Sequence, residues 1–193
     1  MTFSRYAIKN RAFWNESVSG DTVVYQERDS QALMAVIDGA GHGIDAHNLS
    51  SKMGDFLNDS QDWSNPSQLI EQLHQIFSPS IGAAVGIAVV DNIQRTITFA
   101  GVGNISAYLL GFNDQSLTST DGSVGYNMRK ISVSTTDLSA GDIVLLHSDG
   151  IQSRFYTQYD PDCKKQSANE ILDYVFKNFE KQHDDASCIV YRV

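Results

Sequence analysis

The sequence has few of the features that mark secreted, membrane-spanning or disulfide-stapled proteins. Only two of its 193 residues are cysteine, and the N-terminus has neither the basic region nor the apolar run of a secretory signal. No uninterrupted apolar run approaches the ~18 residues that a membrane span needs. Cys163 and Cys188 lack metal-ligand spacing, and we expect Cys163 in a polar loop, Cys188 in a strand, and both as free thiols in a cytoplasmic protein.

Positive charge is also scarce. The chain has 14 lysine and arginine residues against 23 acidic residues, a net charge of −9. Nucleic acids and anionic membranes are bound by clustered cations, so we expect neither as a partner. An acidic chain can still build a site from carboxylates around metal ions. With 41% hydrophobic residues and a length close to one average domain, the composition predicts a single globular domain over residues 1–193.

Hydrophobic periodicity predicts a chain dominated by strands, with two early helices and one late helix. The early helices should cover residues 44–58 and a segment that starts at Asn65-Pro66, and the late one residues 168–179. We predict strands over residues 8–15, 22–27, 31–37, 83–90, 96–100, 105–110, 131–133, 143–147 and 187–193. This distribution favours an α/β (α+β) fold in which helices cover mostly antiparallel sheets, rather than alternating βαβ units.

Aspartates stand at four predicted strand ends. Asp21 opens a strand, Asp38 and Asp149 each close one and precede a glycine, and the pair Asp184 and Asp185 precedes the last strand. Each could be structural, since aspartate is favoured in turns. All four together are harder to explain as turns. Carboxylates at close quarters repel unless a cation lies among them, and ligands of oxygen alone suit Mg²⁺ or Mn²⁺.

Five segments in order resemble the motifs of the PPM-type metal-dependent Ser/Thr protein phosphatases, most closely the bacterial SpoIIE branch. These segments are residues 19–21 (SGD), 36–43 (VIDGAGHG), 101–104 (GVGN), 146–150 (LHSDG) and 184–187 (DDAS). Each motif alone is weak, whereas the ordered set is specific and spans about residues 19–191. The resemblance implies a four-layer αββα sandwich of two mostly antiparallel sheets, with a centre for two Mn²⁺ or Mg²⁺ ions at one end.

The resemblance also implies a role for each ligand. Asp38 should bridge both ions, the Gly39 carbonyl and Asp21 should serve the second, and Asp149 and Asp184 should complete the first. In this family, water held between the ions attacks phosphoserine or phosphothreonine in line, and no phosphoenzyme forms. Two cations about 3.5–4 Å apart would activate that water and offset the charge of the phosphoryl group. Of the last aspartate pair, only the first residue fits the ligand position of the motif.

The sequence departs from the family pattern at two places. The larger PPM phosphatases carry a histidine where this chain has Ala40. His42, two residues later, either transfers a proton or shapes the turn before the first helix. No convincing counterpart of the phosphate-binding arginine is present. Arg5, Arg11 and Arg28 are candidates by position only.

The other histidines have simpler expected roles. His47 and His74 should lie on exposed helix faces and be solvated. His147 should pack in the interior, and His183 could lie just outside the metal ligands. The aromatic cluster at residues 155–159 is either a local hydrophobic plug or a docking surface for a protein.

We therefore expect a metal-dependent phosphatase acting on a regulatory protein. The resemblance implies that the substrate is a phosphorylated STAS-domain protein of a bacterial partner-switching or stressosome pathway. The sequence leaves the oligomeric state open, with a monomer favoured. The alternatives are an inactive pseudophosphatase that binds a partner and a hydrolase of small phosphoesters. The set Asp21, Asp38, Asp149 and Asp184 argues against the first, and the missing arginine argues against the second.

Overall fold

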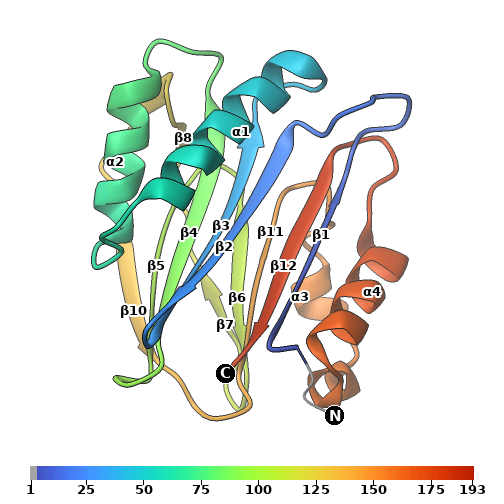
Figure 1. Cartoon of the computed structure of the whole chain (residues 1–193). Coiled ribbons are helices and arrows are strands. Elements are labelled where there is room, and N and C mark those ends of the chain that lie inside the picture. Colours follow the sequence, from blue (N-terminus) through green and yellow to red (C-terminus); the bar gives the residue numbers. More distant parts are fainter. Residues whose placement is uncertain (1–3) are drawn as a thin grey trace.

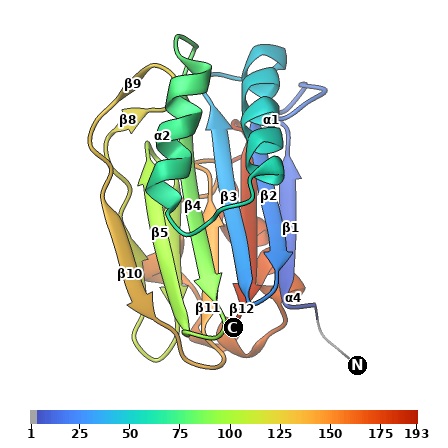
Figure 2. The same ribbon diagram turned by 60° about the vertical axis from the view of Figure 1, so that its left-hand side comes forward.

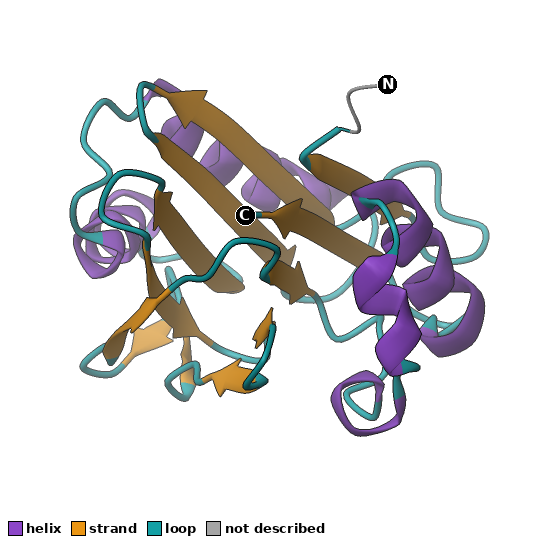
Figure 3. Cartoon of the chain, turned by 90° about the horizontal axis from the view of Figure 1, so that it is seen from below, coloured by secondary structure: helices purple, strands orange, loops and turns teal. Residues whose placement is uncertain are grey.

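A computed structural model of the chain describes residues 4–193. Residues 1–3, part of the segment tested for a secretory signal and of the 1–193 domain range, lie outside the described residues. Two five-stranded antiparallel sheets lie face to face, and helices cover their outer faces (Figure 1). Viewed from one end, the helices lie on opposite sides of the strands (Figure 3). The expected four-layer sandwich is confirmed.

The sheets have the following strands in spatial order. The first sheet contains β1 (Tyr6–Arg11), β12 (Ala186–Arg192), β11 (Ile143–His147), β6 (Ser106–Leu110) and β7 (Gln115–Leu117). The second contains β10 (Val133–Asp137), β5 (Thr96–Val102), β4 (Ala83–Asp91), β3 (Gln31–Gly39) and β2 (Asp21–Arg28). A separate short hairpin pairs β8 (Gly122–Ser123) with β9 (Asn127–Met128).

The helices form the two outer layers. Helices α1 (Ile44–Asp59) and α2 (Pro66–Phe77) lie on the second sheet (Figure 2). On the first sheet lie α3 (Phe155–Gln158), the 3-10 helix η1 (Pro161–Lys165) and α4 (Ala168–Phe179). None of the helices within residues 4–193 combines the length and the apolar character needed to cross a membrane.

Strand β3 shows why both faces of each sheet are covered. Leu33 and Ile37 pack under α1 and α2, whereas Met34 and Val36 pack between the two sheets. Alternate residues of a strand point to opposite faces, so a continuous apolar run buries both. Strands β4, β11 and β12 follow the same rule.

Helices α2 and α4 begin where the sequence predicts because each has a local side-chain cap. Asn65 accepts hydrogen bonds from the backbone of Ser67 and Gln68 at the start of α2, with proline at the first helical position. At the start of α4, Ser167 and Glu170 form a reciprocal capping box. The bounds predicted for α4 are confirmed.

The first predicted strand, residues 8–15, is wrong at both ends. Strand β1 covers Tyr6–Arg11 instead. The chain turns after Arg11, where the Glu16 N–H donates to the Phe13 carbonyl and Asn15 adopts a φ of 73°. A left-handed residue cannot continue an extended strand.

The strand predicted at residues 131–133 is also wrong. Strand β10 covers Val133–Asp137 and pairs only with β5, as the edge of its sheet. Its residues are half-buried or exposed, so no apolar run marks it. Before this strand, residues 122–128 form the β8–β9 hairpin, and Val124 pairs with Ala83.

Both cysteines are buried free thiols. Cys188 lies in β12, as expected. Cys163 is not in a polar loop, because it is a buried residue of η1. Burial raises the pKa of the Cys163 thiol to about 11, which leaves it protonated and unreactive at neutral pH.

Candidate active site

Strand direction brings the predicted site residues to one end of the sandwich, the upper end in Figure 1. Strand β2 begins there and β3 ends there, so Asp21 and Asp38 face each other as register partners. Strand β11 ends and β12 begins at the same end, where the Ser148 N–H donates to the Ser187 carbonyl at 3.0 Å. Pairing within each sheet and the packing of the two sheets therefore bring together residues as distant in sequence as Asp21 and Ser148.

An open cavity of about 830 Å³ lies between these strand ends. Asp38, Asp149 and Asp184 line it, together with a fourth carboxylate, Asp121. No lysine or arginine lies on its wall within residues 4–193. Asp21 lies beneath the wall and is only 2% exposed. The structure thus brings all four predicted aspartates together, three on the surface of the cavity and one below it.

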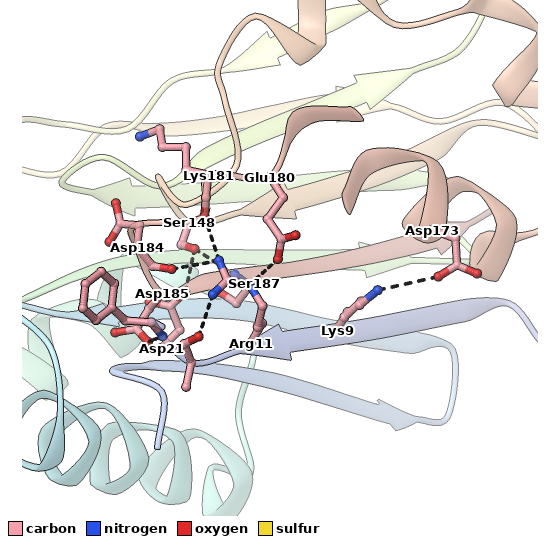
Figure 4. Close-up of polar contacts among 12 residues, drawn as sticks. Lys9, Arg11, Asp21, Ser148, Asp173, Glu180, Lys181, Asp184, Asp185 and Ser187 are labelled. Atoms are coloured by element: carbon pink, nitrogen blue, oxygen red, sulfur yellow. Dashed lines mark hydrogen bonds and ion pairs between the residues drawn. The ribbon is translucent and has the colours of Figure 1, made fainter. Parts of the chain in front are cut away.

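Asp21 has one satisfied oxygen and one unsatisfied oxygen. Its Oδ2 accepts a hydrogen bond from the Ser148 hydroxyl at 2.5 Å, and that hydroxyl accepts from the Ser187 N–H at 3.0 Å (Figure 4). Its Oδ1 is buried with no hydrogen-bond partner within residues 4–193. Burial raises the pKa of Asp21, although the bond from Ser148 opposes the shift. A buried carboxylate oxygen without a partner is costly unless a cation completes it.

The carboxylates around the cavity repel one another. Burial raises the pKa of Asp38, and the charges of Asp21, Asp149 and Asp184 raise it further. Burial and Asp149 likewise raise the pKa of Asp184. A divalent cation would remove this repulsion.

The oxygen-only set fits Mg²⁺ or Mn²⁺ better than a softer metal. Within residues 4–193, no three His, Cys, Asp or Glu side chains close on one point to hold a metal. The carboxylates instead surround a wide cavity. That arrangement suits ions that keep several water ligands, as Mg²⁺ does.

After Asp38 and Asp149, glycine is needed because another backbone passes very close. A Cβ on Gly39 would lie 2.5 Å from the Ala46 carbonyl oxygen of α1. A Cβ on Gly150 would lie 1.9 Å from the Asp185 carbonyl oxygen. Each glycine therefore lets a strand end press against a neighbouring element, which fixes the aspartate before it.

The adjacent aspartates at the start of β12 have different surroundings. Asp184 lies on the cavity wall. Asp185 is buried, and its Oδ1 accepts a hydrogen bond from the Phe13 N–H at 2.7 Å. Asp185 thus anchors the loop after β1, which leaves Asp184 as the member of the pair that faces the cavity.

None of the three arginines considered for phosphate binding lies on the cavity wall. Arg11 bonds Glu180 and the carbonyl oxygens of Lys181 and Asp184, at 2.7 and 2.9 Å (Figure 4). Arg5 pairs with a glutamate of β2 at the opposite end, and Arg28 lies over the ring of Trp63. Position in the sequence was a poor guide, because it carries no information on which sheet end a side chain reaches.

Two histidines lie on the cavity wall, His42 and His183. The Nδ1 of His42 donates to Glu16 at 2.9 Å, which ties the turn before α1 to the loop after β1. Of the two roles considered for His42, this contact favours the shaping of the turn. His147 is fully buried, and its Nδ1 donates to the Ser148 carbonyl at 2.7 Å. Burial lowers the pKa of His147 to about 4, so it is a neutral interior residue.

The expectation that His47 and His74 are solvated is wrong. Both are half-buried. The Nδ1 of His47 donates to the Ser19 carbonyl at 2.9 Å, and the Nδ1 of His74 accepts from the Gly125 N–H at 3.0 Å. Each ring joins a helix to a loop, a contact that helical periodicity does not reveal.

The aromatic cluster at residues 155–159 is mainly packing. Phe155 is fully buried against α4, and Tyr156 and Tyr159 pack partly against the same cluster. Of the two alternatives, the hydrophobic plug describes this cluster better.

Three site residues had no predicted role. The Asn104 amide donates to Asp149 at 2.8 Å, Ser148 supports Asp21, and Asp121 lines the cavity. Asp121 could have been found from the sequence, because it precedes Gly122 just as Asp38 precedes Gly39 and Asp149 precedes Gly150. Asn104 and Ser148 contact the aspartates rather than the cavity centre, so their roles are visible only in the folded structure.

Comparison with known proteins defines the family. The family model of Stage II sporulation protein E (SpoIIE) matches residues 28–193. The chain belongs to the SpoIIE family. Among curated proteins, this chain is similar to the phosphoserine phosphatase RsbX of Bacillus subtilis (strain 168), with 25% identity over 138 residues. That match covers 70% of this chain and 69% of the relative.

Solved structures agree with the family. A structure from work on the bacterial stressosome has a TM-score of 0.86 and 25% identity, covering 97% of this chain and 98% of its own. The structure of RsbX in complex with magnesium has a TM-score of 0.83 and 22% identity, and the match covers 97% of this chain and 94% of RsbX. The PP2C phosphatase domain of SpoIIE from Bacillus subtilis has a TM-score of 0.76 and 21% identity, and the match covers 100% of this chain and 64% of that structure. The last two show that this chain shares the PP2C fold.

Proposed function

We propose that this SpoIIE-family chain is a metal-dependent phosphatase that hydrolyses phosphoserine or phosphothreonine on a protein. The observation that carries the proposal is the set of carboxylates at one sheet end, with a buried Asp21 oxygen that lacks a partner. The similarity to the phosphoserine phosphatase RsbX gives that set a chemistry.

The residues that would hold two divalent ions are those of the family pattern. Asp38 would touch both, the Gly39 carbonyl and Asp21 would serve one, and Asp149 and Asp184 the other. Ions bound there supply an activated water and offset the charge of the phosphoryl group. The donor set suits Mn²⁺ or Mg²⁺, and RsbX has been solved with magnesium.

Other side chains of the site orient these ligands. Asn104 fixes one oxygen of Asp149, and Ser148 fixes one oxygen of Asp21, so both carboxylates are preoriented. No lysine or arginine on the described cavity wall can clamp the phosphate. Affinity must therefore come from elsewhere on the substrate, which favours a docked protein over a small phosphoester.

We infer a phosphorylated STAS-domain protein of a stressosome or partner-switching pathway as the substrate. This assignment is supported by the similarity to RsbX and to a structure from work on the bacterial stressosome. It also fits the acidic composition, which disfavours a nucleic acid partner.

The test is phosphate release from phosphorylated STAS-domain proteins and from p-nitrophenyl phosphate, each with EDTA, Mn²⁺ or Mg²⁺. We expect metal-dependent release, far faster from the protein, that is abolished in Asp38→Asn. Full activity after exhaustive chelation would exclude the metal mechanism. Binding of the phosphoprotein without release would identify a pseudophosphatase, and preference for the small ester would identify a small-phosphoester hydrolase.

A further inference from the structure

A second hollow of about 400 Å³ opens beside the catalytic cavity and carries the opposite charge. The two share Asn104 and Asp149, so they adjoin. The second hollow adds Lys181 and Arg154, whereas the described wall of the first has four aspartates and no lysine or arginine. The charge of the surface therefore reverses across Asp149.

The backbone of Lys181 is fixed while its side chain is free. Its N–H donates to the Gly150 carbonyl and its carbonyl accepts from Arg11, both at 2.7 Å. Within residues 4–193, its ammonium group has no hydrogen bond or ion pair. In Figure 4 the side chain extends away from the Arg11 network, on the side of the Asp184 carboxylate. A rigid backbone thus presents an unpaired cation at the edge of the cavity.

Arg154 supplies the second cation of this hollow. Its guanidinium lies 5.9 Å from the ring centroid of Phe179, and among the described residues it has no hydrogen bond or ion pair. Its carbonyl accepts from the Gln158 N–H at 3.0 Å, which holds its backbone at the start of α3. Elsewhere, in contrast, Lys9 and Lys164 are paired with aspartates.

We propose that Lys181 and Arg154 bind the carboxylate of an aspartate or glutamate that flanks the phosphorylated residue of the substrate. The proposal rests on the proposed phosphatase activity. The reacting phosphate takes the cavity of aspartates, whereas the adjoining hollow offers a flanking carboxylate two cations and the hydroxyl and amide groups of Ser106, Gln152 and Ser153. Three residues of extended chain reach about 10 Å, so the acidic residue should lie within three positions of the phosphoserine.

The test uses phosphoserine peptides with neutral flanks, in which one glutamate is placed in turn at each of the three positions on either side. Matched peptides carry glutamine or a second phosphoserine there. We measure kcat/KM with Mn²⁺ and, by fluorescence anisotropy, peptide binding. The proteins are wild type, Lys181→Gln, Arg154→Gln and the double variant. The matched control is Lys177→Gln, which removes the same charge from the last turn of α4.

We expect the wild type to prefer one glutamate peptide over its glutamine match by about tenfold, in kcat/KM and in binding. The double variant should lose this preference and still hydrolyse the glutamine peptide at the wild-type rate. The control should keep the preference. Anisotropy separates the two proposals: if no peptide is hydrolysed, the phosphatase activity fails, whereas a glutamate preference in binding still supports the subsite.

Three results would overturn the subsite. The wild type could show no acidic preference in either measurement. The variants could lose kcat/KM equally on glutamate and glutamine peptides, which would place the cations on the reacting phosphoryl group. The wild type could prefer the second phosphoserine over glutamate, which would make the hollow a phosphate site rather than a carboxylate site.

Discussion

The two ends of the sandwich treat their carboxylates in opposite ways, a half-buried aspartate at one end and the aspartates of the cavity at the other. At the end away from the cavity, Asp114 accepts from Lys164 at 2.6 Å and from the Tyr159 hydroxyl. Burial alone would raise the pKa of Asp114, but these bonds lower it below its usual value. At the cavity end, Asp21 keeps an unpartnered oxygen, and burial and like charges raise the pKa of Asp38.

The contrast separates a carboxylate that stabilises the fold from carboxylates that destabilise it when no ion is bound. Asp114 has a cation and a hydroxyl of its own chain as partners. Among the described residues, the cavity aspartates accept from the Ser148 hydroxyl and the Asn104 amide but form no ion pair with a cation, so they cost stability when no ion is bound. Sites that cost stability are typical of function.

Replacing Asp38 should have the largest effect. Asp38→Asn removes the carboxylate that would touch both ions, so turnover should fall by at least ~10³-fold. The same change removes repulsion, so the metal-free variant should be more stable, by about 1 kcal/mol. Phosphate release and urea unfolding in EDTA measure the two effects. Near-wild-type turnover would exclude the bridging role.

Asp184 and Asp185, adjacent before β12, allow the same comparison between a cavity carboxylate and a structural one at neighbouring positions. Asp184→Asn should reduce turnover by ~10²-fold or more and weaken Mn²⁺ binding, because Asp184 faces the cavity. Asp185→Asn should keep Mn²⁺ binding and lose about 1–2 kcal/mol of stability, because the Phe13 N–H loses a charged acceptor. Calorimetric titration and thermal unfolding of both variants measure this. The opposite pattern would shift the ligand by one residue.

A smaller effect is expected at His42, which bonds Glu16 on the cavity rim. His42→Ala should reduce turnover by less than ~100-fold, since we assign it no proton in the reaction. The dependence of kcat on pH should keep its shape. A loss of its acidic or basic limb would instead assign the proton transfer to His42.

Substitution of Asp114, at the end of the sandwich away from the cavity, should change stability but not turnover. Asp114→Asn should lower the free energy of unfolding by about 1–2 kcal/mol at pH 7 and leave turnover unchanged. The folded pKa of Asp114 lies below its unfolded value of about 3.9, so its contribution is complete above that pH and is lost as the pH falls through the folded value. Urea unfolding of both proteins from pH 7 to pH 2 should show the difference shrinking below pH 4. A constant difference would show that the charge is not involved.

Local signals predicted much of the fold and of the site. The start of α4 has a capping box and the helix a single apolar stripe, so its bounds could be predicted. Asp38 and Asp149 follow apolar runs buried on both faces, so their strand ends could be placed. Antiparallel pairing places Asp21 beside Asp38 and the start of β12 beside the end of β11, and the packing of the two sheets then brings the two pairs of aspartates together.

Contacts between distant segments could not be predicted. Strand β1 stops at Arg11, whose guanidinium bonds the segment before β12 instead of a phosphate. Edge strand β10 lacks an apolar run, because only one neighbour pairs with it. The cations Lys181 and Arg154 have no motif and lie in loop segments, so only the folded structure brings them beside Asp149.

The central claim is that the carboxylates at the cavity end form a divalent-metal centre. Calorimetric titration of Mn²⁺ into the metal-free wild type, Asp38→Asn and Asp114→Asn tests it most directly. We predict saturable binding by the wild type and by Asp114→Asn, and strongly weakened binding by Asp38→Asn. In the two binding proteins, Mn²⁺ at 100 times its Kd should add about 2.7 kcal/mol of stability. Mn²⁺ binding of equal affinity in all three proteins, or none in the wild type, would contradict the account.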